Sequence, residues 1–195
     1  EQAVAGNHLG DIGYAIQSVL GQTYQDFEIV IVDDGSKDNS VEVIRSFTDP
    51  RIRLICFEQN QGACTAAKRL LQEAKGEYIA ILNSDDAFLP EKLAKQVDFL
   101  DKNDKYGAVF SYAQIIDEAG EIFTDENHFY SKIFVQENKS RHEWLRYFFY
   151  NGNCLCHPSI MIRSECYESV GFYDERYYQL PDFDFWIRLC LKYEI

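Results

Sequence analysis

The chain has 195 residues, 46% of them hydrophobic and 15% aromatic, which is enough apolar material for one folded domain and excludes a disordered chain. Its formal net charge of −13, from 32 acidic and 19 basic residues, argues against a nucleic-acid-binding protein, because such a surface repels phosphate backbones. The same charge would repel a phosphorylated substrate unless a metal ion compensates for it.

Helical and strand patterns alternate through the first half of the chain. The first helix has Ile12, Ile16, Val19 and Leu20 on one face, and the β-branched run that follows is typical of a strand buried on both faces. In chain order we predict helix 12–20, strand 27–32, a helix capped by Asp38 or Asn39, strand 53–57, a helix from Gly62 to Ala74, strand 78–82 and a helix with Pro90 in its first turn.

This alternation predicts an α/β fold, with a mostly parallel sheet and helices on both of its faces. In such sheets ligands bind outside the carboxyl ends of the strands. Two acidic clusters, Asp33-Asp34 and Asp85-Asp86, follow two of the predicted strands. We therefore expect both clusters at the ligand-binding edge of the sheet.

The second half of the chain is less regular. We predict strand 108–113, a hairpin turn at 117–120 into residues 121–124, a polar, mobile loop at 125–140, an aromatic helix 142–150, strand 158–163, a short helix capped by Ser164 that ends at Gly171, and a last helix opened by Asp182-Phe-Asp184.

Six cysteines are present, and their spacing does not form the paired knuckles of a zinc site. Most lie in apolar runs, so we predict reduced, structural thiols rather than a disulfide framework. No apolar run approaches the roughly 20 residues of a membrane span, and no signal peptide opens the chain. We expect a cytoplasmic protein, at the inner face of the membrane if a longer parent chain supplies an anchor.

The pair Asp85-Asp86 has two interpretations. Two neighbouring carboxylates at a strand end are costly without a cation. Divalent cations such as Mg²⁺ take one or two protein carboxylates together with substrate phosphates. The alternative is a solvated turn whose aspartates cap the next helix, and spacing alone favours that turn. The segment Asp33-Asp34-Gly35-Ser36 has the same alternative, since Asp and Gly dominate turns.

Other polar and aromatic residues are also open to two interpretations. Asp182 either favours a helix N-terminus through the helix dipole or acts as a general base beside an acceptor hydroxyl. His157 is more often a packed residue than a ligand, and a role near the substrate stays open. Tyr112, Trp144 and Trp186 could stack on a sugar or base, although core packing better accounts for the tryptophans.

Several segments, taken together and in order, resemble the glycosyltransferase family 2 enzymes, which have the GT-A fold. The resemblance covers about residues 12–191. It is carried by Ser18–Ser36, Asn60-Gln-Gly62, Ala74–Asp86, Gly171–Glu175 and Asp182–Arg188. It implies a single GT-A-like catalytic domain over 1–195, with a nucleotide-sugar-binding half at 1–105 and an acceptor-side half at 106–195.

The resemblance also implies roles for individual residues. Asp34 would bind the base of the donor, Asp85 would lie near the ribose, and Asp86 would be the main ligand of Mn²⁺ or Mg²⁺. Gly62 belongs to the donor-side segment, and Asp182 matches the position of the catalytic base. The implied reaction is an inverting transfer from a nucleotide-sugar, usually a UDP-sugar, to a hydroxyl of a glycan, lipid-linked or protein acceptor.

Several positions depart from the family pattern. Residues 1–6 lack the usual apolar first strand, Asn83 stands where many members have Asp, Ala67-Lys68 replaces an Arg-Asn pair, and Pro181 replaces an acidic residue. These departures keep open an alternative, a catalytically silent nucleotide-sugar-binding or scaffold module. A nucleotidyltransferase is disfavoured because the chain lacks a glycine-rich, basic phosphate loop. We expect the chain to be part of a longer protein, since it stops soon after the last predicted helix begins.

Overall fold

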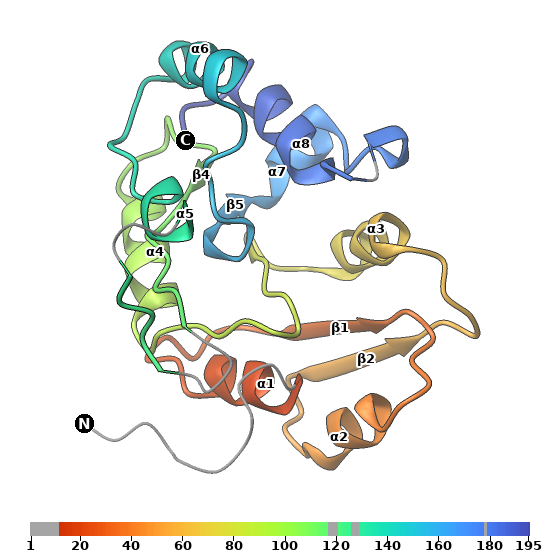
Figure 1. Ribbon diagram of the computed structural model, residues 1–195. Coiled ribbons are helices and arrows are strands. Elements are labelled where there is room, and N and C mark those ends of the chain that lie inside the picture. Colours follow the sequence, from red (N-terminus) through yellow and green to blue (C-terminus); the bar gives the residue numbers. More distant parts are fainter. Residues whose placement is uncertain (1–11, 117–120, 126–128, 178) are drawn as a thin grey trace.

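A computed structural model describes residues 12–116, 121–125, 129–177 and 179–195 (Figure 1). Its first half contains α1 (Ile12–Leu20), β1 (Ile29–Asp33), α2 (Ser40–Ser46), β2 (Ile52–Cys56), α3 (Ala63–Glu73), β3 (Tyr78–Ala80) and α4 (Lys92–Asp101). Its second half contains β4 (Ala108–Val109), α5 (Phe129–Ile133), α6 (Arg141–Asn151), the 3₁₀ turn η1 (His157–Ser159), β5 (Met161–Arg163), α7 (Ser164–Val170), the 3₁₀ turn η2 (Glu175–Tyr177) and α8 (Pro181–Cys190).

The α/β fold class predicted from the sequence is confirmed in the first half. β1 and β2 pair in parallel, from Ile29 opposite Ile52 to Asp33 opposite Cys56. Figure 1 shows α1 and α2 on one side of this ladder and α3 on the other. Because both strands run the same way, the loops after Asp33 and Cys56 lie at one edge.

The pairing of β3 differs from the expected continuation of a parallel sheet. β3 and β4 both pair antiparallel with β5, in the order β3-β5-β4. The fully buried Ile162 of β5 lies opposite Ile79 on one side and Ala108 on the other. A short strand buried in this way has its backbone groups satisfied from both sides. β3 therefore belongs to a separate three-stranded sheet, formed with two strands of the second half.

The main core lies where α6, α7 and α8 pack against β5, on the side of Figure 1 opposite β1 and β2. Phe185, Trp186, Leu189 and Cys190 make the inner face of α8 and are fully buried. A second cluster joins α4 to the sheet through Phe88, Leu93, Leu100 and Met161. The two tryptophans are core residues, since Trp144 and Trp186 are 3% and 0% exposed.

Three local expectations need correction. The polar loop predicted at 125–140 contains the short helix α5. The strand predicted from Pro158 begins later, because Pro158 lies in η1, where Ser159 N–H donates to the Cys156 carbonyl. Pro90 precedes α4, and its carbonyl accepts the N–H of Thr23 at 2.8 Å.

The cysteine and membrane predictions can also be compared with the structure. All six cysteines are free thiols, as expected. Among the described residues, no helix is both long and apolar enough to cross a membrane. The expectations for residues 1–6 and for the turn at 117–120 lie outside the described residues.

Candidate active site

The loops that follow β1 and β2 are joined by hydrogen bonds. The carboxylate of Asp34 accepts two backbone N–H groups, from Gln61 at 2.7 Å and from Gly62 at 2.8 Å. Gly35 has φ +76°, and a Cβ there would lie 2.8 Å from the backbone of Asn60. Only glycine fits this combination of dihedral and close approach, so the Asp-Asp-Gly-Ser segment owes its glycine to this loop contact.

This contact gives Asp34 a structural role that the sequence did not indicate. A carboxylate offers about four acceptor positions, so both oxygens retain capacity for a ligand after these two bonds. Gly62 has φ +92° and opens α3, and its N–H is already engaged by Asp34. The preceding Asp33 is 8% exposed and accepts the N–H of Ser36 at 3.2 Å.

Asp85 and Asp86 follow β3 and differ in their surroundings. Asp85 is exposed, whereas Asp86 is half-buried and accepts a 2.9 Å hydrogen bond from Nδ2 of Asn83. Burial raises the pKa of Asp86, the Asn83 bond lowers it, the charge of Asp85 raises it, and His157 lowers it, with a net rise. Within the described ranges no lysine or arginine forms an ion pair with Asp86. This carboxylate is therefore poorly compensated, which is the state that a bound cation relieves.

His157 feels the charges of two acidic residues from distant parts of the chain. Burial lowers its pKa, while the negative charges of Asp182 and Asp86 both raise it. Its Nε2 is 2.9 Å from the hydroxyl of Tyr173. The imidazole thus shares one environment with Asp86 and Asp182, and these three predicted site residues are brought together by the fold.

Asp182 is the second residue of α8, where the helix dipole favours a negative charge. Its Oδ2 accepts a 2.9 Å hydrogen bond from Nδ2 of Asn153, which lies in the turn after α6. Phe148 of α6 packs edge-on against Phe183, with ring centroids 5.5 Å apart. These contacts fix the start of α8 against the end of α6. The role of Asn153 could not be predicted from the sequence, because it depends on a side chain 29 residues away.

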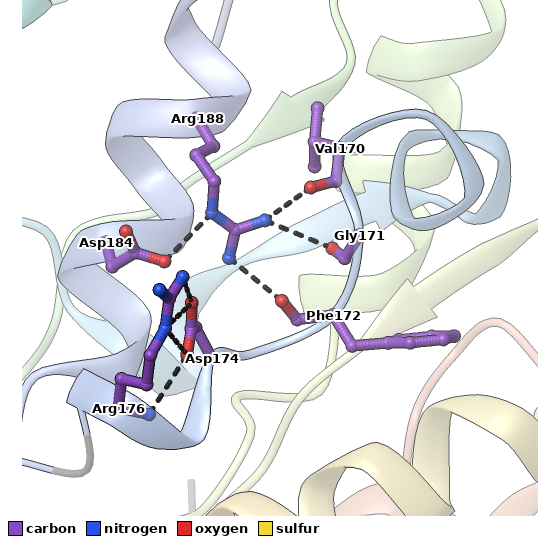
Figure 2. A network of polar contacts seen from close by, with 7 residues as sticks. All are labelled: Val170, Gly171, Phe172, Asp174, Arg176, Asp184 and Arg188. Carbon is purple, nitrogen blue, oxygen red and sulfur yellow. Dashed lines mark hydrogen bonds and ion pairs between the residues drawn. The ribbon is translucent and has the colours of Figure 1, made fainter.

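Arg188 ties α8 to the turn that follows α7 (Figure 2). Its Nε pairs with Asp184 at 2.8 Å, one helical turn earlier. Its Nη1 donates to the carbonyls of Val170 and Gly171, and its Nη2 donates to the carbonyl of Phe172 at 2.9 Å. The guanidinium therefore satisfies carbonyls left open at the end of α7, immediately before Tyr173.

Lys92 is a further residue that the sequence did not indicate. Its ammonium group donates to Oε1 of Gln96 at 2.8 Å and lies 4.0 Å from the ring centroid of Phe88. Burial lowers the pKa of Lys92 to about 7. Gln96 in turn donates to the carbonyl of Ser159 at 2.7 Å, which links α4 to the turn that carries His157.

The predicted site residues therefore form two groups. Asp86, His157 and Asp182 share one environment, with the exposed Asp85 beside Asp86, and Asp34 and Gly62 form the second group after β1 and β2. In the part of the chain that the structure describes, no group of three or more His, Cys, Asp or Glu residues is arranged to hold a metal. Any divalent cation here needs further oxygen ligands from water or substrate.

Comparison with known families and proteins gives a consistent result. The family model described as "Glycosyl transferase family 2" matches residues 5–171. A relative from Methanocaldococcus jannaschii, "Uncharacterized glycosyltransferase MJ1057", is 34% identical over 177 residues, covering 89% of this chain and 58% of the relative. "Putative glycosyltransferase EpsE" of Bacillus subtilis is 28% identical over 179 residues, covering 89% of this chain and 60% of the relative. The chain thus spans somewhat more than half the length of these relatives.

Solved structures are similar in fold. S. aureus TarS 1-349 in complex with UDP has a TM-score of 0.72 at 18% identity, over 93% of this chain and 52% of that chain. Mannosyltransferase PcManGT from Pyrobaculum calidifontis, in complex with GDP-Man and Mn²⁺, has a TM-score of 0.61 at 21% identity, over 84% of this chain and 43% of that chain. At these identities the likeness concerns the fold alone, and it confirms the predicted GT-A-like class.

Proposed function

The chain belongs to glycosyl transferase family 2, and from this premise we propose that it transfers a sugar from a nucleotide-diphosphate-sugar to an acceptor hydroxyl, with inversion at the anomeric carbon. The observation that carries the proposal is the shared environment of Asp86, His157 and Asp182. Asp86 suits the diphosphate and its counter-cation, and Asp182 suits the acceptor hydroxyl. A UDP-sugar is the first donor to test.

Asp182 is the proposed general base. Asn153 binds its Oδ2, which orients the carboxylate and leaves Oδ1 for the proton of an acceptor hydroxyl. The acceptor oxygen forms its bond to the anomeric carbon as the bond to the nucleoside diphosphate breaks. The proton passes to Asp182, and the electron pair of the broken bond leaves with the diphosphate. This single displacement inverts the anomeric configuration.

Asp86 is the proposed ligand of a divalent cation, Mn²⁺ or Mg²⁺. The residues fit such a group, because Asp86 is half-buried, forms no ion pair with a lysine or arginine of the described segments, and has the carboxylate of Asp85 beside it. Water and diphosphate oxygens would complete the ligand set. When bound, the cation supplies positive charge that stabilises the departing diphosphate. It also removes the repulsion expected between a diphosphate and a chain of net charge −13.

The loops after β1 and β2 are the proposed donor side. Asp34, after β1, would contact the base of the nucleotide, and Gly62, after β2, would line the donor side next to it. Asp85, which follows β3, would lie near the ribose. Support comes from the hydrogen bonds between these loops, which hold Asp34 and Gly62 together at one edge of the sheet. It also comes from the similar folds of TarS, seen with UDP and UDP-GlcNAc, and of PcManGT, seen with GDP-Man and Mn²⁺.

The decisive experiment is a titration of UDP- and GDP-sugars, with and without Mn²⁺, followed by calorimetry and by release of the nucleoside diphosphate. We expect at least one donor to bind more tightly with Mn²⁺ and to be turned over when a glycan, lipid-linked or protein acceptor is added. If no nucleotide-sugar binds in either condition, the proposal fails. Tight binding without turnover of any donor or acceptor would instead identify a silent nucleotide-sugar-binding module.

A further inference from the structure

We propose that Tyr173 is a positioning residue, whose hydroxyl holds the imidazole of His157 in place beside Asp86 and Asp182. The inference rests on the proposed function, because only that function makes the position of His157 important for activity. The contact itself is independent of it. Tyr173 lies in the segment Gly171–Glu175 that carries the family resemblance, but neither that motif nor the comparisons assign it a role.

The contact joins two side chains with little freedom to rearrange. The Tyr173 hydroxyl lies 2.9 Å from Nε2 of His157, and the tyrosine is 6% exposed. A histidine ring with one nitrogen engaged in this way is restricted about its side-chain torsions, and the roles of its two nitrogens are fixed relative to each other. Tyr173 therefore decides which ring orientation His157 presents to the site.

Tyr173 is itself held firmly from two sides. Its ring packs edge-on against Phe185, with centroids 5.5 Å apart and an interplanar angle of 89°. Its backbone follows Phe172, whose carbonyl accepts a hydrogen bond from Arg188 (Figure 2). Both Phe185 and Arg188 belong to α8. Tyr173 thus takes its place from the helix that also carries the proposed base Asp182.

This arrangement has a mechanical consequence for the site. Asp182 lies on the first turn of α8, and His157 is linked to the same helix through Tyr173. The spacing between the carboxylate and the imidazole is therefore set through Tyr173, whose turn between α7 and η2 is held against α8 by Phe185 and Arg188. Groups in a reacting centre need their mutual geometry fixed to within a fraction of an ångström, and such indirect supports are the usual means.

The hydroxyl of Tyr173 is also the part of the side chain that packing does not explain. The surrounding rings, including Phe185, would accept a phenylalanine of the same shape. A buried phenol needs a hydrogen-bond partner, and the Tyr173 hydroxyl has His157, with the neighbouring hydroxyl of Tyr167 as a second group that interacts with it. If the bond has a purely structural role, its loss lowers the stability of the protein. If it positions His157, its loss also lowers kcat, and an experiment can distinguish the two.

The first test is Tyr173→Phe in the full chain, assayed with Mn²⁺ and the best donor. We expect kcat to fall about tenfold while the donor KM stays within about twofold, because the hydroxyl would act through His157 and not through a donor contact of its own. The control is Tyr78→Phe, which removes a hydroxyl bonded to Asp101 and Arg163 outside the site. It should leave kcat unchanged. Equal kcat in Tyr173→Phe and the wild type overturns the proposal.

A double-mutant cycle tests whether Tyr173 acts through His157. In a His157→Ala background, Tyr173→Phe should have no further effect on kcat beyond about twofold, since the group that it positions is gone. If Tyr173→Phe costs the same factor with and without His157, the two residues act independently. That result would also overturn the proposal, even if each single variant is impaired.

A spectroscopic readout keeps the test independent of activity. The chain has four histidines, so ¹⁵N-histidine labelling gives few imidazole signals, and His157→Ala assigns the relevant one. We expect the His157 ring nitrogens to shift in Tyr173→Phe and to stay in place in Tyr78→Phe. Unchanged signals in Tyr173→Phe refute the contact and the proposal with it. Absence of transfer by the wild type, with the shift observed, would refute the proposed function and leave the positioning contact standing.

Discussion

The side-chain amide of Asn83 donates a 2.9 Å hydrogen bond to the carboxylate of Asp86. At this position many family members have an acidic residue, so the substitution exchanges a third negative charge for a donor. Burial and the neighbouring Asp85 nevertheless raise the pKa of Asp86. The amide and His157 both lower this pKa but do not bring it back to its ordinary value, so a bound cation is the compensation that fits the half-buried carboxylate.

The first prediction is that Asp86→Ala removes the gain in nucleotide affinity that Mn²⁺ brings. We expect UDP binding in Mn²⁺ to weaken by at least about tenfold, to the level measured in a chelator, because the main oxygen ligand is lost. Asp85→Ala is the matched control, with an effect of at most a few-fold. Calorimetric titrations with and without Mn²⁺ measure both. An Asp86→Ala variant that keeps its response to Mn²⁺ would remove Asp86 from the metal site.

The second prediction concerns Asp182→Asn, which keeps the size of the side chain and an oxygen that can accept the Asn153 bond. We expect the donor to bind within about twofold of the wild type. Transfer should fall by about 10²- to 10⁴-fold, because an amide does not take up the proton of the acceptor hydroxyl. Direct donor titration and initial-rate assays give the two quantities. Full transfer activity in this variant would mean that another group is the base.

The fold was predictable where its signals are local. The helical periodicity of α1 and the β-branched run of β1 are each contained in a short stretch of neighbouring residues, so the sequence shows them directly. The partner of β3 was not predictable, because β5 lies far along the chain and pairing depends on burial from both sides. Short elements such as α5 carry too few residues for a periodic signal.

The candidate site divides in the same way. Asp86 and Asp182 could be named from motifs and His157 only as an open candidate, and their convergence required the fold. The supporting residues Asn153 and Tyr173 could not be named, since each acts on a side chain from another segment. Sequence therefore identified the groups that would do chemistry, and the structure supplied the groups that hold them.

The third prediction compares two glycines with positive φ. Gly35 has φ +76°, and an added Cβ would lie 2.8 Å from backbone atoms of Gln59 and Asn60, which have little room to move. Gly62 has φ +92° with open space around the added atom. We expect Gly62→Ala to lower the free energy of unfolding by about 1 kcal/mol from backbone strain, and Gly35→Ala by at least about 2 kcal/mol from strain and overlap together. Denaturant unfolding measures both, and the reverse order would contradict the packing of these loops.

The last prediction uses the pKa of Lys92, which burial lowers from 10.5 to about 7. Below pH 7 the lysine is charged in the folded and unfolded chain alike, so the cost of burying its charge is fully present. Between pH 7 and 10.5 the unfolded chain keeps a proton that the folded chain has released, so the free energy of unfolding rises with pH, by at most about 1.4 kcal/mol per unit. Lys92→Met has a similar unbranched shape and no proton to lose. We therefore expect it to be more stable than the wild type at pH 7, with the difference shrinking towards pH 10 in denaturant titrations. Groups that titrate in both the wild type and the variant cancel in this comparison. If the difference in the free energy of unfolding between the two does not change with pH, Lys92 titrates as an exposed lysine does.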